Sequence, residues 1–360
     1  MGTGGEGPGG GARRRRRATA LAAGAAAVAL AVGGTAWALS GPGTLTAAQI
    51  ASQTDPALVD VVTTLGYQHA SAAGTGMVLT SDGEVLTNNH VVAGATSITV
   101  RDVGNGRTYT AKVVGYSDNS DVAVLQLSGA SGLRTVTTGD SGSVAVGHRV
   151  VALGNAEGKN GTPSVATGTV TALGATITAA DQGSGTTEQL TGMIRTNAGI
   201  QPGDSGGPLV NSHGQVIGMN TAASSNGSLP IGTTAAETTA AFSIPINKAL
   251  AIADQIEAGQ ASSTVHIGAT AFLGVQVSSN DVSGGGVAIA GTVPGAAAAN
   301  AGLGAGDVIL SVAGHAITSG SDLQSLIAGY HPGDKVTVQW QDQSGQTHTS
   351  VLTLSQGPTG

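Results

Sequence analysis

A serine surrounded by glycines is the residue best suited to covalent chemistry in this chain. Residues 199–210 read Gly-Ile-Gln-Pro-Gly-Asp-Ser-Gly-Gly-Pro-Leu-Val, so glycines lie on both sides of Ser205 and an apolar run follows. Glycine tolerates positive φ, which lets backbone N–H groups turn toward one point. The amides of Gly203 and Ser205 could then stabilise the oxyanion of a tetrahedral intermediate. A tight Gly-Pro turn between two strands uses the same residue types and is the alternative interpretation.

A serine nucleophile needs a base and an acid that orients the base, and the chain offers a candidate for each. His90 follows the strand-like run 84–89, and Asp121 precedes the apolar run 122–125. Taken singly, His90 could be a polar residue at a strand end and Asp121 a turn residue or strand cap. Together the three follow the order His, Asp, Ser, with intervals of about 30 and 85 residues, which is the order in chymotrypsin-type proteases.

Most of the sequence that must position these residues has the pattern of short strands. The chain has 360 residues, 59 of them glycine, and only 2% aromatic residues. Its length suggests about two domains. Short apolar runs separated by Gly, Asp and Asn turns fill residues 58–128 and 141–248, which favours β structure. Only residues 247–257 show helical spacing, with apolar side chains at 250, 252, 253 and 256.

Five blocks of sequence resemble, in order and spacing, the HtrA (DegP/DegS-like) trypsin-fold proteases. They are residues 75–78, 86–92, 121–125, 203–209 and 216–221. The resemblance implies a chymotrypsin-like double antiparallel β-barrel, with the triad in the crevice between two six-stranded barrels. It also implies that the Gly203 and Ser205 amides form the oxyanion hole.

The resemblance also covers the substrate-binding region, with some departures. Residues Phe242, Ser243 and Ile244 resemble the family's strand beside the substrate, whose edge could pair with a peptide; a simple core strand is the alternative. No acid lies at 199–202, so the resemblance favours small aliphatic side chains in the specificity pocket over Lys or Arg. Asn197 stands where the family usually has Asp, and Asp204 where it usually has Asn. The stretches 179–189 and 222–240 are expected to be mobile loops near the site.

A second unit follows from about residue 268 to 357. Residues 272–275 resemble the carboxylate-binding loop of a PDZ domain, and residues 321–329 would be the helix that lines its groove. In such a domain the amides of Leu273, Gly274 and Val275 would hold a chain-terminal carboxylate while the peptide adds a strand. A generic α+β domain whose glycines only make turns is the alternative.

The N-terminal segment predicts export. Arg13 to Arg17 form a basic block, and no charged residue occurs from Ala18 to Leu39, a length sufficient to cross a bilayer core of ~30 Å. The arginines would keep the N-terminus in the cytoplasm. Ala36-Trp37-Ala38 permits a cleaved secretory signal instead, which would make the protein secreted. A soluble Arg-rich nucleic-acid-binding tail leaves the apolar run unexplained.

The predicted fold is therefore mainly β: a chymotrypsin-like double barrel followed by a PDZ-like α+β domain, with an N-terminal transmembrane helix. The expected domains are a cytoplasmic tail at 1–17, a transmembrane or signal segment at 18–39, a linker at 40–55, a protease domain at 56–257, a linker at 258–267 and a PDZ domain at 268–357.

Composition narrows the function classes. The net charge is −7, and five of the fourteen Lys and Arg lie in the N-terminal block, so the acidic remainder argues against nucleic acid as a partner. The absence of cysteine excludes disulfides and thiolate metal sites, and no cofactor or metal is expected.

We expect a membrane-anchored serine endopeptidase whose catalytic part is extracytoplasmic. Its partners would be misfolded or regulatory protein substrates, C-terminal peptides at the PDZ domain, and the membrane through the N-terminal helix. The family often forms trimers, so a homotrimer is one assembly that the resemblance implies. The alternatives are a peptide-binding, chaperone-like protein with a degenerate protease domain, a protease inactive until a ligand reaches the PDZ-like unit, and an α/β-hydrolase esterase. The esterase would need the order Ser, acid, His and alternating helices.

Overall fold

The computed structural model describes Met1 and residues 43–66, 70–155, 161–180, 187–221, 240–278 and 285–358. Every element below belongs to the compact unit Leu45–Gly360. The predicted transmembrane or signal segment at 18–39 lies outside the described residues. Within the described ranges, no helix combines the length and the apolar character that a membrane span requires.

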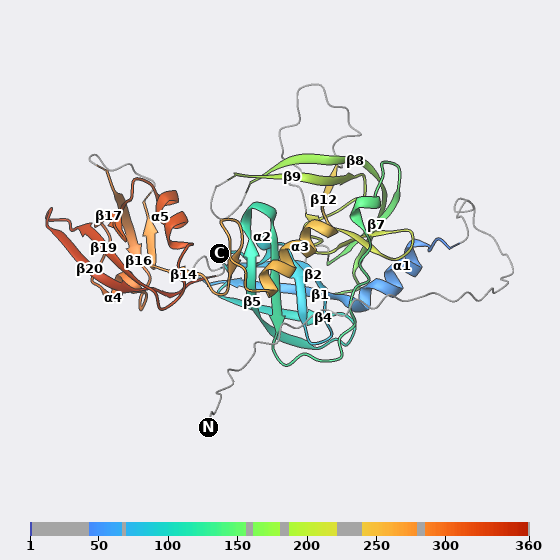
Figure 1. The fold of residues 1–360 in the computed structure, drawn as a ribbon, viewed down its shortest axis with the longest axis horizontal. Coiled ribbons are helices and arrows are strands. Elements are labelled where there is room, and N and C mark those ends of the chain that lie inside the picture. The colour runs from blue at the N-terminus through green and yellow to red at the C-terminus, as the bar shows by residue number, and fades with distance from the viewer. Residues whose placement is uncertain are drawn as a thin grey trace, which may run out of the picture. The chain divides into compact units, whose positions relative to one another are not determined.

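The first half of the predicted protease domain forms a closed antiparallel barrel (Figure 1). Its strands are β1 (Leu58–Leu65), β2 (Ala70–Val78), β3 (Glu84–Thr87), β4 (Ser97–Asp102), β5 (Thr108–Ser117) and β6 (Val122–Leu127). They pair in the order β1-β2-β3-β6-β5-β4, and β4 returns to β1. Alternating side chains pack inside this barrel, where Val61, Val85 and Leu125 are fully buried.

The second half closes in the same way. Its strands are β7 (Arg149–Gly154), β8 (Ser164–Ala180), β9 (Thr187–Thr196), β10 (Pro208–Asn211), β11 (Val216–Thr221) and β12 (Ala241–Pro245). They close in the order β10-β11-β12-β9-β8-β7. The double antiparallel barrel predicted from the sequence is therefore confirmed. A further core cluster contains Met77 and Leu86 of the first barrel together with Met219 and Ile244 of the second, so apolar packing joins the barrels.

A helix precedes the first barrel where the sequence analysis expected only a linker at 40–55. Helix α1 (Ala47–Thr54) begins with a capping box, in which the Thr46 hydroxyl accepts from the Gln49 amide while the Gln49 side chain accepts from the Thr46 amide. These bonds satisfy donors at the helix start that would otherwise lack partners. Ile50 and Ala51 then pack into the core shared by the barrels. A 3₁₀ turn, η1 (Asp55–Ala57), leads directly into β1.

The helix expected at 247–257 is present as α3 (Ile246–Glu257), and its buried face carries Ala249, Ala253 and Ile256. The predicted linker at 258–267 ends in a short strand, β13 (His266–Ile267), which pairs with β5. The remaining short helical turns of this region are α2 (Asn89–Val92), η3 (Asp118–Ser120) and η4 (Ser141–Ser143).

The C-terminal unit has its own apolar core, with Ile309, Val338 and Leu352 among its buried residues. Its main sheet has the order β15-β16-β17-β19-β20, and β18 pairs with β17; β14 pairs with β21. The elements are β14 (Ala271–Phe272), β15 (Val275–Val277), β16 (Val287–Thr292), α4 (Ala297–Asn300), β17 (Val308–Val312), β18 (His315–Ala316), α5 (Gly320–Ile327), β19 (Lys335–Gln341), β20 (Thr347–Thr353) and β21 (Ser355–Gln356).

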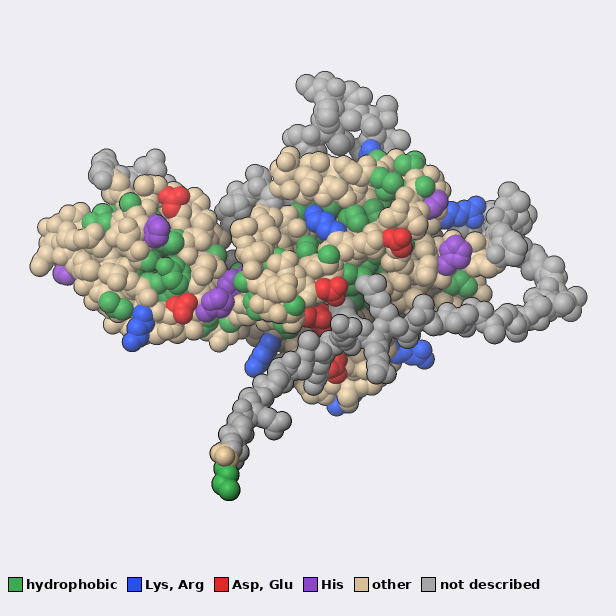
Figure 2. Space-filling model, viewed as in Figure 1, with side chains coloured by type: hydrophobic (Ala, Val, Ile, Leu, Met, Phe, Trp, Pro, Cys, Tyr) green, Lys and Arg blue, Asp and Glu red, His purple; other side chains and the backbone are tan. Residues whose placement is uncertain are grey.

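The surface is poor in charge, as the content of 10% charged residues requires. Figure 2 shows the Lys, Arg, Asp and Glu side chains of one face as small separate groups within a largely uncharged surface. Folding therefore depends mainly on apolar burial and on hydrogen bonds among Ser, Thr and Asn side chains rather than on surface ion pairs, which contribute little.

Candidate active site

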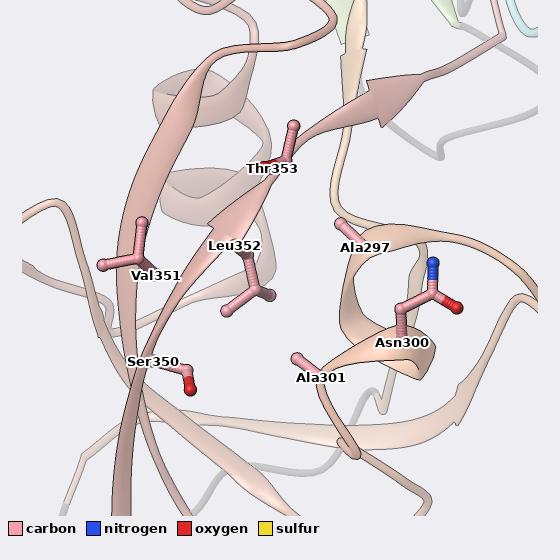
Figure 3. Close-up of a pocket in the computed structure, with 7 residues that line it drawn as sticks. All are labelled: Ala297, Asn300, Ala301, Ser350, Val351, Leu352 and Thr353. Carbon is pink, nitrogen blue, oxygen red and sulfur yellow. The ribbon is translucent and has the colours of Figure 1, made fainter.

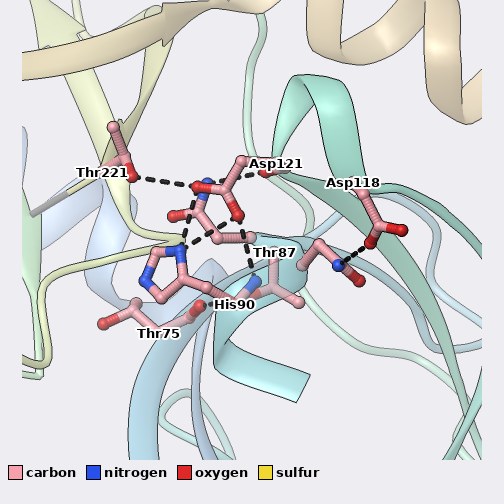
Figure 4. Close-up of polar contacts among 8 residues, drawn as sticks. Thr75, Thr87, His90, Asp118, Asp121 and Thr221 are labelled. Carbon is pink, nitrogen blue, oxygen red and sulfur yellow. Dashed lines mark hydrogen bonds and ion pairs between the residues drawn. The ribbon is translucent and has the colours of Figure 1, made fainter. Parts of the chain in front are cut away.

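The structure brings His90 and Asp121 into direct contact (Figure 4). Nδ1 of His90 lies 2.9 Å from Oδ2 and 3.0 Å from Oδ1 of Asp121, and the His90 amide donates to Oδ1 at 3.0 Å. The Asp121 side chain is 6% exposed, whereas the His90 side chain is 45% exposed. A buried carboxylate thus fixes the ring of a histidine that remains accessible, which is the geometry of an oriented general base.

Local turns explain how Asp121 reaches this position. Turn η3 delivers Asp121 at the start of β6 in the left-handed region, at φ 52°. Its carbonyl accepts from the Asn88 side chain at 2.9 Å, just before α2 carries His90. From the second barrel, the Thr221 hydroxyl at the end of β11 donates to Oδ2 at 3.0 Å. The carboxylate is therefore held by donors from both barrels.

The backbone of Ser205 lies against the strand next to His90. The amide of Thr75, on β2, donates to the Ser205 carbonyl at 2.8 Å. A Cβ added to Gly74 would lie 2.7 Å from methyl groups of Val91 and 3.2 Å from the Ser205 carbonyl oxygen. The Ser205 carbonyl and the Val91 side chain of α2, the helix that carries His90, therefore both lie close to Gly74. Ser205 is 4% exposed.

The residues before Ser205 form a tight turn. The Asp204 amide donates to the Gln201 carbonyl at 3.0 Å, and Gly203 has φ 95°. Proline at the second position and a positive-φ glycine at the third are the features of a type II turn. The Thr75 hydroxyl donates to the Gly203 carbonyl at 2.7 Å and accepts from the Asn155 amide at 2.8 Å. The carbonyl face of the turn is therefore tied to the first barrel.

Asp204 itself is buried, at 1% exposure. Its carboxylate accepts from the Ser164 hydroxyl at 2.7 Å and from the Gln201 amide at 2.9 Å. Burial raises the pKa of Asp204 above its ordinary value, and these two hydrogen bonds oppose that shift.

The predicted substrate-binding strand lies within the second barrel. Phe242, Ser243 and Ile244 lie on β12, which pairs with β11 on one side and with β9 on the other. Both edges are therefore occupied at residues 242 and 243, and no edge remains there for a peptide. Ser243 and Ile244 are fully buried, and the Ser243 hydroxyl donates to Asn220. Phe242 and Ser243 are thus paired on both sides, as a core strand would be, which is the alternative interpretation of the sequence. The expected loop 222–240 lies almost wholly outside the described residues.

In the C-terminal unit, the predicted carboxylate-binding residues lie in a turn before an edge strand. Leu273 is buried, Gly274 has φ 78°, and Val275 begins β15 at one end of the sheet order. Helix α5 lies beside this strand, because a Cβ on Gly320 would lie 3.2 Å from Val277. The helix predicted at 321–329 is thus present one residue earlier at its start and two earlier at its end.

A hollow of about 300 Å³ lies elsewhere in this unit, between α4 and β20 (Figure 3). It is lined by Ala297, Asn300, Ala301 and residues 350–353. Within the described part of the chain, no group of three or more His, Asp or Glu residues is arranged to hold a metal ion.

The sequence analysis missed the hydroxyl and amide groups that support the site. Thr75, Asn88 and Thr221 fall inside motif blocks but received no role, and Ser164 was not singled out. Thr221 lies 100 residues from Asp121 and Ser164 lies 40 residues from Asp204. Polar side chains that two closed barrels bury must find hydrogen-bond partners, and this requirement was a usable signal. It does not identify which residues those partners are.

The domains match known families. Residues 74–219 match the trypsin-like peptidase domain family, and residues 271–351 match the PDZ domain family. The chain thus contains a trypsin-like peptidase domain followed by a PDZ domain.

Related proteins identify the family more narrowly. The chain is 33% identical over 296 residues to the serine protease Do-like HtrA of Lactococcus lactis, covering 79% of this chain and 71% of that protein. It is 36% identical to the serine protease PepD of Mycobacterium tuberculosis, over 85% of this chain and 65% of PepD. It is also 36% identical to the periplasmic pH-dependent serine endoprotease DegQ of Escherichia coli, over 73% of this chain and 55% of DegQ. The chain belongs to the HtrA family of bacterial serine proteases, although it spans less than two thirds of the length of PepD and of DegQ.

Proposed function

We propose that this protein is a serine endopeptidase that cleaves protein substrates with Ser205 as nucleophile. His90 takes the Ser205 proton as the hydroxyl attacks the peptide carbonyl, and then gives it to the leaving amine. Asp121 holds the ring through Nδ1 and stabilises the imidazolium. The Gly203 and Ser205 amides receive the oxyanion, and water then releases the acyl group from Ser205.

The observation that carries this proposal is the pairing of an accessible histidine with a buried carboxylate. His90 and Asp121 meet at 2.9 Å while the backbone of Ser205 is bound to the neighbouring strand through Thr75. The Gly203 amide makes no hydrogen bond to the rest of the described chain, which leaves it available to an oxyanion. Membership of the HtrA family supports the same chemistry.

We further propose that the PDZ domain binds C-terminal peptides at residues 273–275. Edge strand β15 offers a backbone for strand addition, and the Gly274 turn offers amides for a terminal carboxylate. Fluorescence polarisation with a C-terminal peptide and its amidated form tests this assignment. Equal affinity for the two forms would contradict carboxylate recognition.

The location of the protease is proposed from its sequence and its relatives. The periplasmic name of DegQ and the apolar segment at 18–39 support an exported catalytic part anchored in the cell membrane. Fractionation of cells, with N-terminal sequencing of the mature protein, distinguishes an anchor from a cleaved signal. A homotrimer is the assembly that we propose from the family, and sedimentation of the full chain tests it.

Labelling with a serine-directed fluorophosphonate tests the central proposal. We expect a single adduct on Ser205, together with cleavage of casein, and we expect both to disappear in Ser205→Ala. Wild type and Ser205→Ala that are equally inert would contradict the proposal and would favour the peptide-binding, chaperone-like alternative. The same experiment with added C-terminal peptides distinguishes a constitutively active enzyme from one that the PDZ domain keeps inactive until a ligand binds.

A further inference from the structure

Asp204 lies in the sequence between Gly203 and Ser205, whose amide and hydroxyl the proposed reaction needs. Its Oδ2 accepts from the Gln201 amide at 2.9 Å, while the Asp204 amide donates to the Gln201 carbonyl at 3.0 Å. Two reciprocal bonds therefore close the turn 201–204 across its ends. The first of them depends on a side chain, so a substitution can remove it without altering the turn's own backbone.

The other carboxylate oxygen is held from a different strand. Oδ1 accepts from the Ser164 hydroxyl at 2.7 Å, and Ser164 is the cross-strand partner of Gly154 where β7 and β8 pair. A Cβ on Gly154 would lie 2.5 Å from Asp204 Cα and 2.7 Å from Oδ1. Gly154 on β7 thus leaves space for the Asp204 carboxylate, and Ser164 on β8 supplies a hydrogen-bond donor to it.

The burial of Asp204 is compensated by no cation in the described part of the chain. Among the described residues, no Lys, Arg or His side chain pairs with it, and its hydrogen-bond donors are neutral. A buried carboxylate with two donors loses a large share of its compensation when one donor is removed. The orientation of the turn should therefore respond strongly to the Ser164 hydroxyl.

We propose that Ser164 and Asp204 form a positioning pair that holds the turn 201–204 in the shape in which the Gly203 amide faces the oxyanion. Neither side chain contacts the reacting atoms. Ser164 holds Asp204, Asp204 holds the Gln201 amide, and the closed turn sets the direction of the Gly203 amide. The inference rests on the proposed function, because this amide direction matters to catalysis only if Ser205 forms a tetrahedral intermediate.

Kinetics of Ser164 variants test the pair. Removing a hydrogen bond to a charged group should lower kcat about tenfold in Ser164→Ala, with KM within about twofold, because substrate binding does not require the oxyanion contact. Ser164→Thr keeps a hydroxyl and should restore most of kcat. Ser164→Cys keeps the shape with a weaker donor and should resemble the alanine variant. If Ser164→Ala fails to fold, the comparison of Cys with Thr carries the test.

The matched control is Ser143→Ala. Its hydroxyl also donates at 2.7 Å, to the Asp140 carbonyl in η4, and it has no link to the 201–204 turn. We expect wild-type kcat in this variant. A loss of thermal stability with unchanged kcat in Ser164→Ala or Ser164→Cys would overturn the inference and leave Ser164 with a purely structural role.

Amide hydrogen exchange of the peptide 199–205 gives a readout that does not need activity. We expect faster exchange there in Ser164→Ala than in wild type and in Ser143→Ala. Equal exchange and equal kcat in an active wild type would overturn the positioning pair while leaving the proposed function intact. If wild type cleaves nothing and matches Ser205→Ala, the proposed function fails, and the exchange comparison still decides whether Ser164 holds the turn.

Discussion

Thr221→Val tests how strongly the second barrel supports the catalytic carboxylate of the first. The Thr221 hydroxyl donates to Asp121 Oδ2 at 3.0 Å, and both residues are buried, at 3% and 5% exposure. Valine has nearly the same shape as threonine and lacks the hydroxyl, so the substitution removes the donor without leaving a cavity. Among the described residues, the carboxylate then keeps only its bonds to His90.

The structure sets the expected magnitude. A hydrogen bond to a charged group contributes about 1.5–3 kcal/mol, and about 1.4 kcal/mol corresponds to a tenfold change in rate. If the lost stabilisation of the imidazolium–carboxylate pair appears fully in the transition state, kcat falls about 10- to 100-fold. KM should change less than about threefold, because the Thr221 hydroxyl is bound to Asp121 rather than directed at substrate.

The assay is steady-state hydrolysis of an aliphatic chromogenic peptide, with fluorophosphonate titration to count competent sites. Thr63→Val is the matched control: Thr63 is fully buried and its hydroxyl donates to the neutral Ala72 carbonyl at 3.3 Å. It should lose about 0.5–1.5 kcal/mol of stability with unchanged kcat. Wild-type kcat in a folded Thr221→Val, or equal losses of kcat in the two variants, would refute the reasoning.

Three further substitutions probe other parts of the molecule. Burial raises the pKa of Asp55 to about 6, so the folded state binds its proton more tightly than the unfolded state. That contribution favours folding below pH ~4 and is lost as pH rises to about 6. Asp55→Asn should therefore raise Tm at pH 7.5. Thr75→Val removes the bond to the Gly203 carbonyl at 2.7 Å and should cost about 1–3 kcal/mol in denaturant titrations while also lowering kcat. Gly274 has φ 78°, and Gly274→Ala would place a Cβ 2.1 Å from the Ala296 Cβ. We expect this variant to lose C-terminal peptide binding, measured by calorimetry, and to retain small-peptide hydrolysis.

Each of these three has an outcome that contradicts its argument. A Tm of Asp55→Asn that equals wild type from pH 4 to 8 would show that the Asp55 carboxylate is solvated. Unchanged kcat in Thr75→Val would show that the turn keeps its orientation without the first barrel. Full peptide affinity in Gly274→Ala would place the carboxylate site away from that turn.

Much of the fold follows from local pattern. Alternating apolar runs with glycine turns predict short strands, and the resemblance to the HtrA proteases implies two barrels that meet at the site of His90, Asp121 and Ser205. The helix α1 was missed although Thr46 and Gln49 have the spacing of a capping box, because its Ala and Thr composition resembles a linker. Local pattern thus identifies strands well and identifies short polar helices poorly.

What the sequence could not predict depends on pairing over long distances. The run 241–245 is strand-like, as expected, but only the closed barrel shows that β9 and β11 occupy both of its edges. Likewise, nothing near Asp204 in the sequence indicates Ser164 as its partner. Strand order and register determine these contacts, and neither can be read from the local pattern of a single sequence.

The supporting contacts run in both directions between the barrels. Thr221 of the second barrel holds Asp121 of the first, and Thr75 of the first barrel holds the backbone of Gly203 and Ser205 in the second. Neither barrel by itself contains both the catalytic carboxylate and the turn that carries the Gly203 amide, and each of these groups accepts a hydrogen bond from the other barrel. Docking of the barrels, through the apolar core they share with α3, therefore assembles the site. A substitution in that shared core should reduce kcat before it reduces strand content, because each strand pairs within its own barrel while the catalytic contacts cross between them.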